Sequence, residues 1–311
     1  CVWEQARHFD DARYYEQAIE KFESGLSIDP KHSILWYVLG AAHLALGEET
    51  DNIRLVEKSI RHFAKAEEYQ IEAYPELWAD SGVALLRLAE HRQDSTLAEM
   101  AMGRFLLCIE SIPSGSTIDQ LTEKSFDECD VFSLHSISHI GCCLDLISRL
   151  REDPFLLEKG IHLLEKVLEV APDLVETRYQ LACSWTDLGY AQGSARAFRR
   201  AHEHFVELLK NHPENDLFHF DYALSLIGFA QEMSLSHIAD LCGETEHHLQ
   251  AAARLGNQEA YYYLGCLFAF HAKALPPVEE ILEEEWLVSL QGMPLFIQWL
   301  KKVSPRESGS R

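Results

Sequence analysis

Residues 34–47, ILWYVLGAAHLALG, carry the helical pattern that decides the fold. Trp36, Leu39, Gly40 and His43 follow one another at i, i+3, i+4 and i+7, so they share one face of a helix. Gly40 has no side chain, which lets a second helix approach closely at this point. The same pattern returns at three later places in the chain: 78–85, 181–185 and 261–268. A helical pattern that recurs in this way indicates an array of repeats.

A second helical pattern follows each copy of the first. Its first copy contains Ala18, Phe22 and Leu26, and later copies end before prolines such as Pro172 and Pro213, which lie 41 residues apart. The two patterns together resemble the tetratricopeptide repeat, a pair of antiparallel helices. The period of about 41 residues is about seven longer than the 34 of that family. We expect the additional residues to lie between the two helices of each repeat, as in 48–54 and 90–96.

The resemblance implies an all-α fold, a right-handed superhelical solenoid of antiparallel helix pairs. One interval between prolines, Pro113 to Pro172, is about 18 residues longer than a period and is predicted to contain a short additional helix over 118–126. The predicted segments are N-terminal repeats over 1–113, an irregular connecting segment over 114–133, C-terminal repeats over 134–275, capping helices over 276–303 and a disordered tail over 304–311.

Composition excludes several classes of partner. Lys and Arg number 27 against 50 Asp and Glu, which gives a formal net charge of −23. Nucleic acids and anionic membrane surfaces are bound by basic proteins, so neither is expected as a partner. We see no run of about 18 apolar residues, and therefore expect no transmembrane segment. The eight cysteines are spread through helical segments, which favours free thiols in a reducing compartment and a cytoplasmic location.

The resemblance also implies a concave groove lined by the first helix of each repeat. With Gly40 counted as position 8, positions 5 and 9 of each first helix lie on the groove side and stack at i, i+4. The candidate groove residues are Tyr37, Ala41, Val83, Cys142, Tyr179, Cys183, Phe220, Leu224, Tyr262 and Cys266. This row is aromatic and aliphatic, without Lys or Arg, which suits an apolar peptide segment. The alternative is that these side chains only pack neighbouring repeats together.

Some members of the family hold a C-terminal carboxylate with Lys, Asn and Arg at fixed groove positions. Tyr37, Ala41 and Asp80 stand at the corresponding positions here. This clamp is therefore absent, and the negative charge of the chain would repel an acidic motif. The pattern favours an apolar or basic segment as the ligand.

A second candidate site contains His135, His139 and Cys142, which project from one helical face. Imidazole and thiolate ligands at this spacing suit zinc, so a zinc-binding helical protein is the alternative function. No CxxC or HExxH motif supports the metal, and the same residues fit an ordinary groove face. The other histidines considered were expected on the surface: His202, His204, His247 and His248.

We find no nucleophile elbow, phosphate loop or kinase motif, and therefore expect neither catalysis nor a cofactor. The sequence favours a non-catalytic scaffold that holds a protein or peptide partner as an adaptor, a co-chaperone or a secretion-type chaperone. A spacer that binds through Trp286 and Trp299 of the predicted capping helices is a further alternative. The oligomeric state is left open.

Overall fold

The structure is a computed structural model of the chain and describes residues 12–69, 75–109, 117–232 and 235–271. Side chains within these ranges are described except at 231–240, 242, 266 and 268–271. Every regular element in the described part is an α-helix, and the predicted all-α class is confirmed. The predicted capping helices over 276–303 and the tail over 304–311 lie outside the described residues.

The chain divides into two compact units, which we call unit 1 (Cys1–Ala171) and unit 2 (Pro172–Arg311). The helices of unit 1 are α2 (Ala12–Ile28), α3 (Ser33–Glu49), α4 (Ile53–Tyr69), α5 (Pro75–Arg92), α6 (Ser95–Leu107), α7 (Ile118–Glu123), α8 (Val131–Arg151) and α9 (Pro154–Val170). The helices of unit 2 are α10 (Val175–Gln192), α11 (Ala195–Asn211), α12 (Asp216–Glu232), α13 (Leu235–Leu255) and α14 (Gln258–His271).

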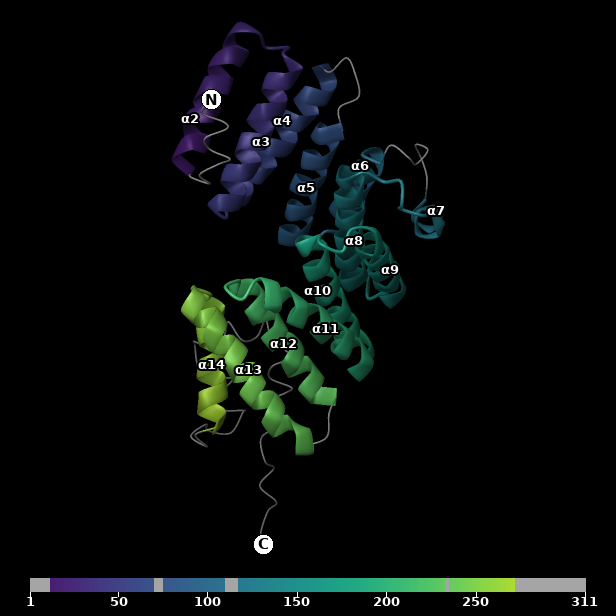
Figure 1. Cartoon of the computed structure of the whole chain (residues 1–311). Helices are drawn as coiled ribbons and strands as arrows, with labels where there is room; N and C mark the ends of the chain where they lie inside the picture. The colour runs from purple at the N-terminus through teal and green to yellow at the C-terminus, as the bar shows by residue number, and fades with distance from the viewer. Residues whose placement is uncertain (1–11, 70–74, 110–116, 233–234, 272–311) are drawn as a thin grey trace. The chain divides into compact units, whose positions relative to one another are not determined.

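Consecutive helices pack in pairs within each unit (Figure 1). In unit 1 the pairs are α3 with α4, α5 with α6, and α8 with α9. In unit 2 they are α10 with α11 and α12 with α13. Within each unit the second helix of a pair also packs on the first helix of the next one: α4 on α5 and α6 on α8 in unit 1, and α11 on α12 and α13 on α14 in unit 2. This alternation is the arrangement that the two sequence patterns predicted.

The connections within the helix pairs are short, so our placement of the additional residues between the helices is wrong. α3 is 17 residues long and α10 is 18, so the additional residues of each repeat lie within the helices. Each described turn holds one left-handed residue, and these are Asp51, Gln93, Glu152 and Gly193, with φ of 48°, 52°, 54° and 59°. The next residue caps the second helix, as where Asp94 accepts a hydrogen bond from the Thr96 amide at 2.8 Å.

Two position-8 glycines, Gly40 and Gly82, bring the two helices of their pairs together. A Cβ at Gly40 would lie 2.6 Å from the Phe63 ring, and one at Gly82 would lie 2.8 Å from the Phe105 ring. Both phenylalanines are almost completely buried, so their rings have little room to move. The sequence pattern of glycine on one helix and phenylalanine on the next therefore corresponds to a direct contact.

The predicted connecting segment lies inside unit 1 and contains α7. The Thr117 hydroxyl and the Gln120 side chain form a capping box at its start. Lys166 of α9 donates to the carbonyl oxygens of Thr122, at 2.8 Å, and Lys124. The segment is thereby held against α9, and α6 still packs directly on α8. The array of helix pairs consequently continues past this insertion.

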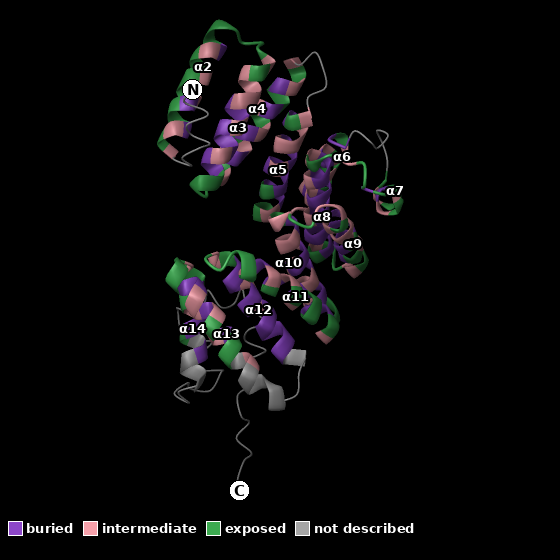
Figure 2. Cartoon of the chain, in the orientation of Figure 1, coloured by how far each residue is buried: buried purple, intermediate pink, exposed green. Residues whose placement is uncertain are grey.

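α8 is long and apolar enough to cross a membrane, and it is the one helix of the described part that meets this criterion. Most of it is buried within the protein, including Ile137, Ile140 and Leu144. Figure 2 shows the same concentration of buried residues along α8. A core helix of a folded domain has the same composition, so this observation is weak support for a membrane span.

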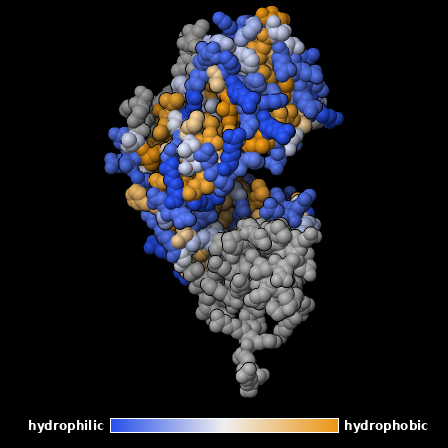
Figure 3. All heavy atoms as spheres, turned by 180° about the vertical axis from the view of Figure 1, so that it is seen from behind, coloured by the Kyte–Doolittle hydropathy of each residue, from blue (hydrophilic) through white to orange (hydrophobic). Residues whose placement is uncertain are grey.

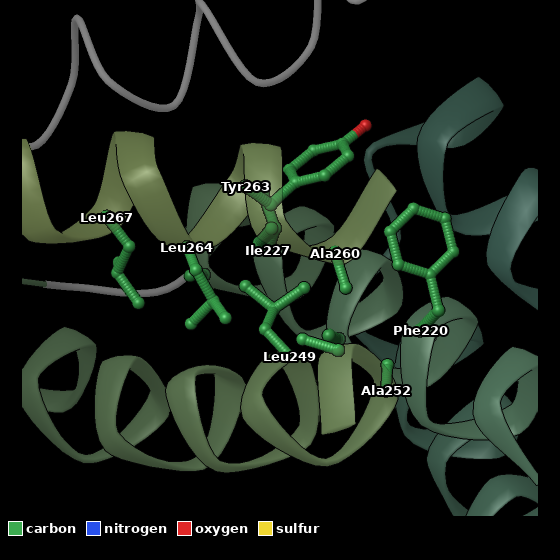
Figure 4. Packing of buried hydrophobic residues seen from close by; sticks show 11 residues of the cluster. Phe220, Ile227, Leu249, Ala252, Ala260, Tyr263, Leu264 and Leu267 are labelled. Atoms are coloured by element: carbon green, nitrogen blue, oxygen red, sulfur yellow. The ribbon is translucent and has the colours of Figure 1, made fainter. Parts of the chain in front are cut away.

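Unit 2 has one core cluster between α10, α11 and α12, which contains Phe205, and another between α12, α13 and α14. The buried residues of the α12–α14 cluster include Ile227 of α12, Leu249 of α13, and Leu264 and Leu267 of α14. Figure 4 shows these side chains converging between the three helices. These clusters fix the position of α12, which carries two of the candidate groove residues, Phe220 and Leu224.

Candidate functional site

The described candidate groove residues are mostly half-buried. This holds for Tyr37, Ala41, Val83, Cys142, Tyr179, Cys183, Leu224 and Tyr262. The side chain of Cys266 lies outside the described ones. Apolar residues reach the visible face of the described part between hydrophilic ones (Figure 3). Half-burial is compatible both with a binding face and with contacts between neighbouring repeats, the two interpretations that the sequence left open.

Phe220 differs from the other candidates because it belongs to the core of unit 2. Its side chain is only 7% exposed, and its ring lies edge-on to that of Tyr263, with the centroids 5.5 Å apart. Figure 4 shows Phe220 beside Ala252 and Ala260. We therefore remove Phe220 from the candidate binding surface. The repeat position of Phe220 could not show that it is buried, because the ring that covers it, that of Tyr263, comes from another helix, α14.

A tyrosine–aspartate hydrogen bond recurs between successive first helices. The Tyr37 hydroxyl of α3 donates to Asp80 of α5 at 2.9 Å, and the Tyr179 hydroxyl of α10 donates to Asp221 of α12. Both tyrosines stand at position 5, and both aspartates at position 6 of the next first helix. The bond fixes the outer end of the ring while its face stays half-buried. Sequence reasoning missed this role of the aspartates, although they follow the tyrosines by similar distances in the sequence, 43 and 42 residues.

The carboxyl group of Asp221 lies in an acidic environment. Burial raises its pKa to about 6, the hydrogen bond from Tyr179 opposes this, and the negative charges of Asp187, Glu259 and Asp216 raise the pKa further. Three helices, α10, α12 and α14, supply these carboxylates. Burial also raises the pKa of Tyr179, so its hydroxyl stays protonated and able to donate. Unit 2 thus combines a half-buried aromatic ring with a group of carboxylates.

His135, His139 and Cys142 do not form the zinc site of the alternative interpretation. His135 Nδ1 lies 2.8 Å from the Val131 carbonyl, and the His139 ring stacks on Phe105 with centroids 4.8 Å apart. Burial raises the pKa of the Cys142 thiol to about 12, and the thiolate that zinc requires is disfavoured. In the described part, no three His, Cys, Asp or Glu side chains come together as a metal site. The zinc interpretation is therefore not supported.

Some of the histidines predicted on the surface lie inside unit 2. The His202 ring stands between Tyr222 and Phe229, with centroids 5.2 Å from each. Burial lowers the pKa of both His202 and His248 to about 4. His247 is exposed, as predicted. Helical periodicity failed for His202 because aromatic side chains of α12 cover what would otherwise be an outer face.

The comparison with known families supports the resemblance, because residues 4–67 match the tetratricopeptide repeat family. The match covers the first repeats of the chain, and the recurring helix pairs carry the resemblance through the rest of the described part. A solved structure, the C-terminal part of a TPR repeat-containing protein from Cytophaga hutchinsonii, aligns over 83% of this chain and 98% of its own, with 11% identity and a TM-score of 0.33. A search of curated proteins finds no match.

Tetratricopeptide repeat proteins are in general non-catalytic scaffolds for protein–protein interaction. In this chain the first helices of the repeats bear the recurring tyrosine–aspartate bond and the half-buried side chains. The surface to consider for a partner is therefore the row of first helices: α3, α5 and α8 in unit 1, and α10, α12 and α14 in unit 2.

Proposed function

We propose that this scaffold binds a protein segment carrying basic and apolar side chains along α10, α12 and α14 of unit 2. The observation that supports this best is the set of charges around Asp221. The charged groups that act on it, Asp187, Glu259 and Asp216, are all carboxylates. A Lys or Arg side chain from a partner would neutralise part of this group and recover the cost of burying Asp221.

Tyr179 supplies the second half of the proposed site. Its ring is half-buried and its hydroxyl is held by Asp221, so little conformational entropy is lost when a partner packs against it. A guanidinium group can stack on such a ring while it approaches a carboxylate. Leu224 and Cys183, also half-buried, would contact apolar side chains of the same segment. The segment proposed here is consequently amphipathic and cationic.

The wider role that we propose is that of an adaptor or a chaperone in the cytoplasm. The net charge of −23 supports it, because a strongly acidic scaffold attracts basic segments and accelerates their association. The described free cysteines are compatible with a reducing compartment.

The test is a selection of peptides from a random display library on the immobilised chain, followed by affinity measurements with fluorescence anisotropy. Selected peptides should be enriched in Arg or Lys next to apolar residues. Asp221→Asn, which keeps the size of the side chain and removes its charge, should weaken their binding about tenfold. The matched control is Asp80→Asn in unit 1, which alters the same tyrosine–aspartate bond and should leave affinity nearly unchanged.

Two outcomes would contradict the proposal. One is a set of selected peptides that is neutral or acidic. The other is equal binding by the parent and Asp221→Asn, with circular dichroism showing that both are folded. If Asp80→Asn weakens binding and Asp221→Asn does not, the binding surface lies in unit 1.

A further inference from the structure

Two imidazole rings join α12 to α13 inside unit 2. His219 Nδ1 and His248 Nδ1 lie 2.8 Å apart, and His219 Nε2 lies 3.0 Å from the carbonyl oxygen of Pro213. A carbonyl oxygen only accepts, so Nε2 of His219 must carry a hydrogen. Nδ1 of neutral His219 is then an acceptor, and His248 must donate from its own Nδ1. The contacts therefore determine the tautomer of both rings.

The charged groups that shift the pKa of His248 are the other histidines, His219 and His247. The His248 ring faces Tyr222 of α12, with centroids 4.6 Å apart, and the neighbouring His247 at 5.1 Å. The Tyr222 hydroxyl donates to Glu244 at 2.9 Å, which engages that carboxylate. Among the described residues, no carboxylate is hydrogen-bonded to either imidazole.

Titratable groups of the other helices packed against α12 contact other residues, as on α10, where Tyr179 donates to Asp221. On α11, His202 contacts the Tyr222 ring. On α14, Tyr263 contacts Phe220 and Glu259 acts on Asp221. Burial, together with the nearby His219 and His247, lowers the pKa of His248 to about 4. A positive charge on the pair is consequently unfavourable, and the first proton has to come from a moderately acidic solution.

We propose that the His219–His248 pair is an acid-sensitive latch that holds α13 on α12. The neutral pair has one hydrogen between the two Nδ1 atoms. A first added proton can enter at His248 Nε2, and the bond between the rings survives because His248 Nδ1 still donates. A second proton must enter at His219 Nδ1, which places two N–H groups and two positive charges against each other. The rings then separate, and the contact between α12 and α13 opens. The latch does not depend on what unit 2 binds.

The first test is nitrogen NMR of the histidines in the full chain. At neutral pH, His219 should carry its hydrogen on Nε2 and His248 on Nδ1. On acidification, protection of the α13 amides from hydrogen exchange should be lost as the pair takes up its second proton. The latch is contradicted if His248 titrates near 6.5, the unperturbed histidine value, while α13 stays protected.

The second test is His248→Gln, since a glutamine amide can donate to His219 Nδ1 but does not titrate in this range. Its α13 amides should stay protected at an acid pH where those of the parent exchange at least tenfold faster. The matched control is His247→Gln, which removes the exposed neighbouring histidine and should behave like the parent. Equal acid sensitivity of the parent and His248→Gln would overturn the latch. If His248→Gln is unfolded at neutral pH, the NMR experiment on the parent still decides.

Discussion

Units 1 and 2 contain the same tyrosine–aspartate bond in different electrostatic surroundings. Tyr37–Asp80 and Tyr179–Asp221 occupy the same positions of the repeat. The carboxylates that surround Asp221 have no counterparts in unit 1. Asp187, Asp216 and Glu259 correspond in register to Ala45, Pro75 and His135. The bond between repeats is therefore common to both units, but three positions around it carry a carboxylate in unit 2 and none in unit 1.

Units 1 and 2 also differ in the positive charges near their carboxylates and in their exposed apolar side chains. In unit 1, Arg87 of α5 pairs with Glu48 at 3.1 Å and Glu90 at 3.2 Å, so these acidic side chains already have a cation. Leu217 of unit 2 is 50% exposed, whereas Glu76 stands at its position in unit 1. Unit 2 thus offers both an apolar side chain and carboxylates to a partner. The proposal that unit 2 binds a basic segment rests on this difference between the units.

The largest expected effect comes from removing the aromatic core residue of one unit. Phe63 and Phe205 are 1% and 0% exposed, and replacing either by alanine should destabilise its own unit by about 3–5 kcal/mol. Because each unit has its own core, amide protection should fall only in the unit that carries the substitution. Hydrogen exchange followed by mass spectrometry measures both units at once. Loss of protection in both units from either substitution would show that they unfold as one.

An acid-sensitive contact of unit 1 is expected where the His139 ring stacks on Phe105. Tyr263 stands at the same position of the repeat in unit 2. Burial lowers the pKa of His139 to about 4, below its ordinary 6.5. Neutral His139 makes its full contribution to the free energy of unfolding of unit 1 above pH 6.5. This contribution, about 3 kcal/mol in total, is lost as the pH falls towards 4. His139→Tyr, which keeps a ring against Phe105, should remove this loss from acid unfolding curves of unit 1. Identical pH dependence of parent and variant would show that His139 titrates normally.

The fold could be predicted from the sequence because the contacts between neighbouring helices require particular residue types at fixed spacings. Gly40 must face a large side chain of the next helix, and Phe63 provides that side chain. The site was less predictable because it depends on side chains from different repeats. Position 5 correctly placed Tyr179 on a half-buried face, but the same rule included Phe220, which α14 covers. Helical periodicity describes one helix at a time and does not show what a helix elsewhere in the chain contributes.

A smaller effect is expected from giving unit 2 the residues of unit 1. Asp187→Ala combined with Glu259→His should weaken binding of the selected basic peptides about tenfold, which is about 1.4 kcal/mol. The same changes should lower the pKa of Asp221 from about 6, because they remove two of the negative charges that raise it. In the parent, Asp221 is charged above pH 6, so binding should weaken as the pH falls through 6.

The pH dependence separates this explanation from simple damage to the fold. A raised carboxyl pKa costs folded-state stability above pH 6, and the double variant should therefore be at least as stable as the parent at pH 7. Anisotropy titrations between pH 5 and 8, with thermal unfolding beside them, measure both quantities. Weaker binding together with a less stable fold would mean that Asp187 or Glu259 is structural.

The smallest expected effect concerns the turns within the helix pairs. Gly193 of unit 2 and Gln93 of unit 1 both adopt left-handed φ, 59° and 52°, at the same position of the repeat. A residue with a Cβ pays about 1 kcal/mol in this conformation, whereas glycine does not. Gln93→Gly should therefore stabilise unit 1 slightly, by less than 1 kcal/mol, because glycine also gains freedom in the unfolded chain. Gly193→Ala should destabilise unit 2 by about 1 kcal/mol. Chemical denaturation followed separately in each unit measures both changes in the free energy of unfolding. Equal changes from the two substitutions would mean that these turn residues do not control the stability of their helix pairs.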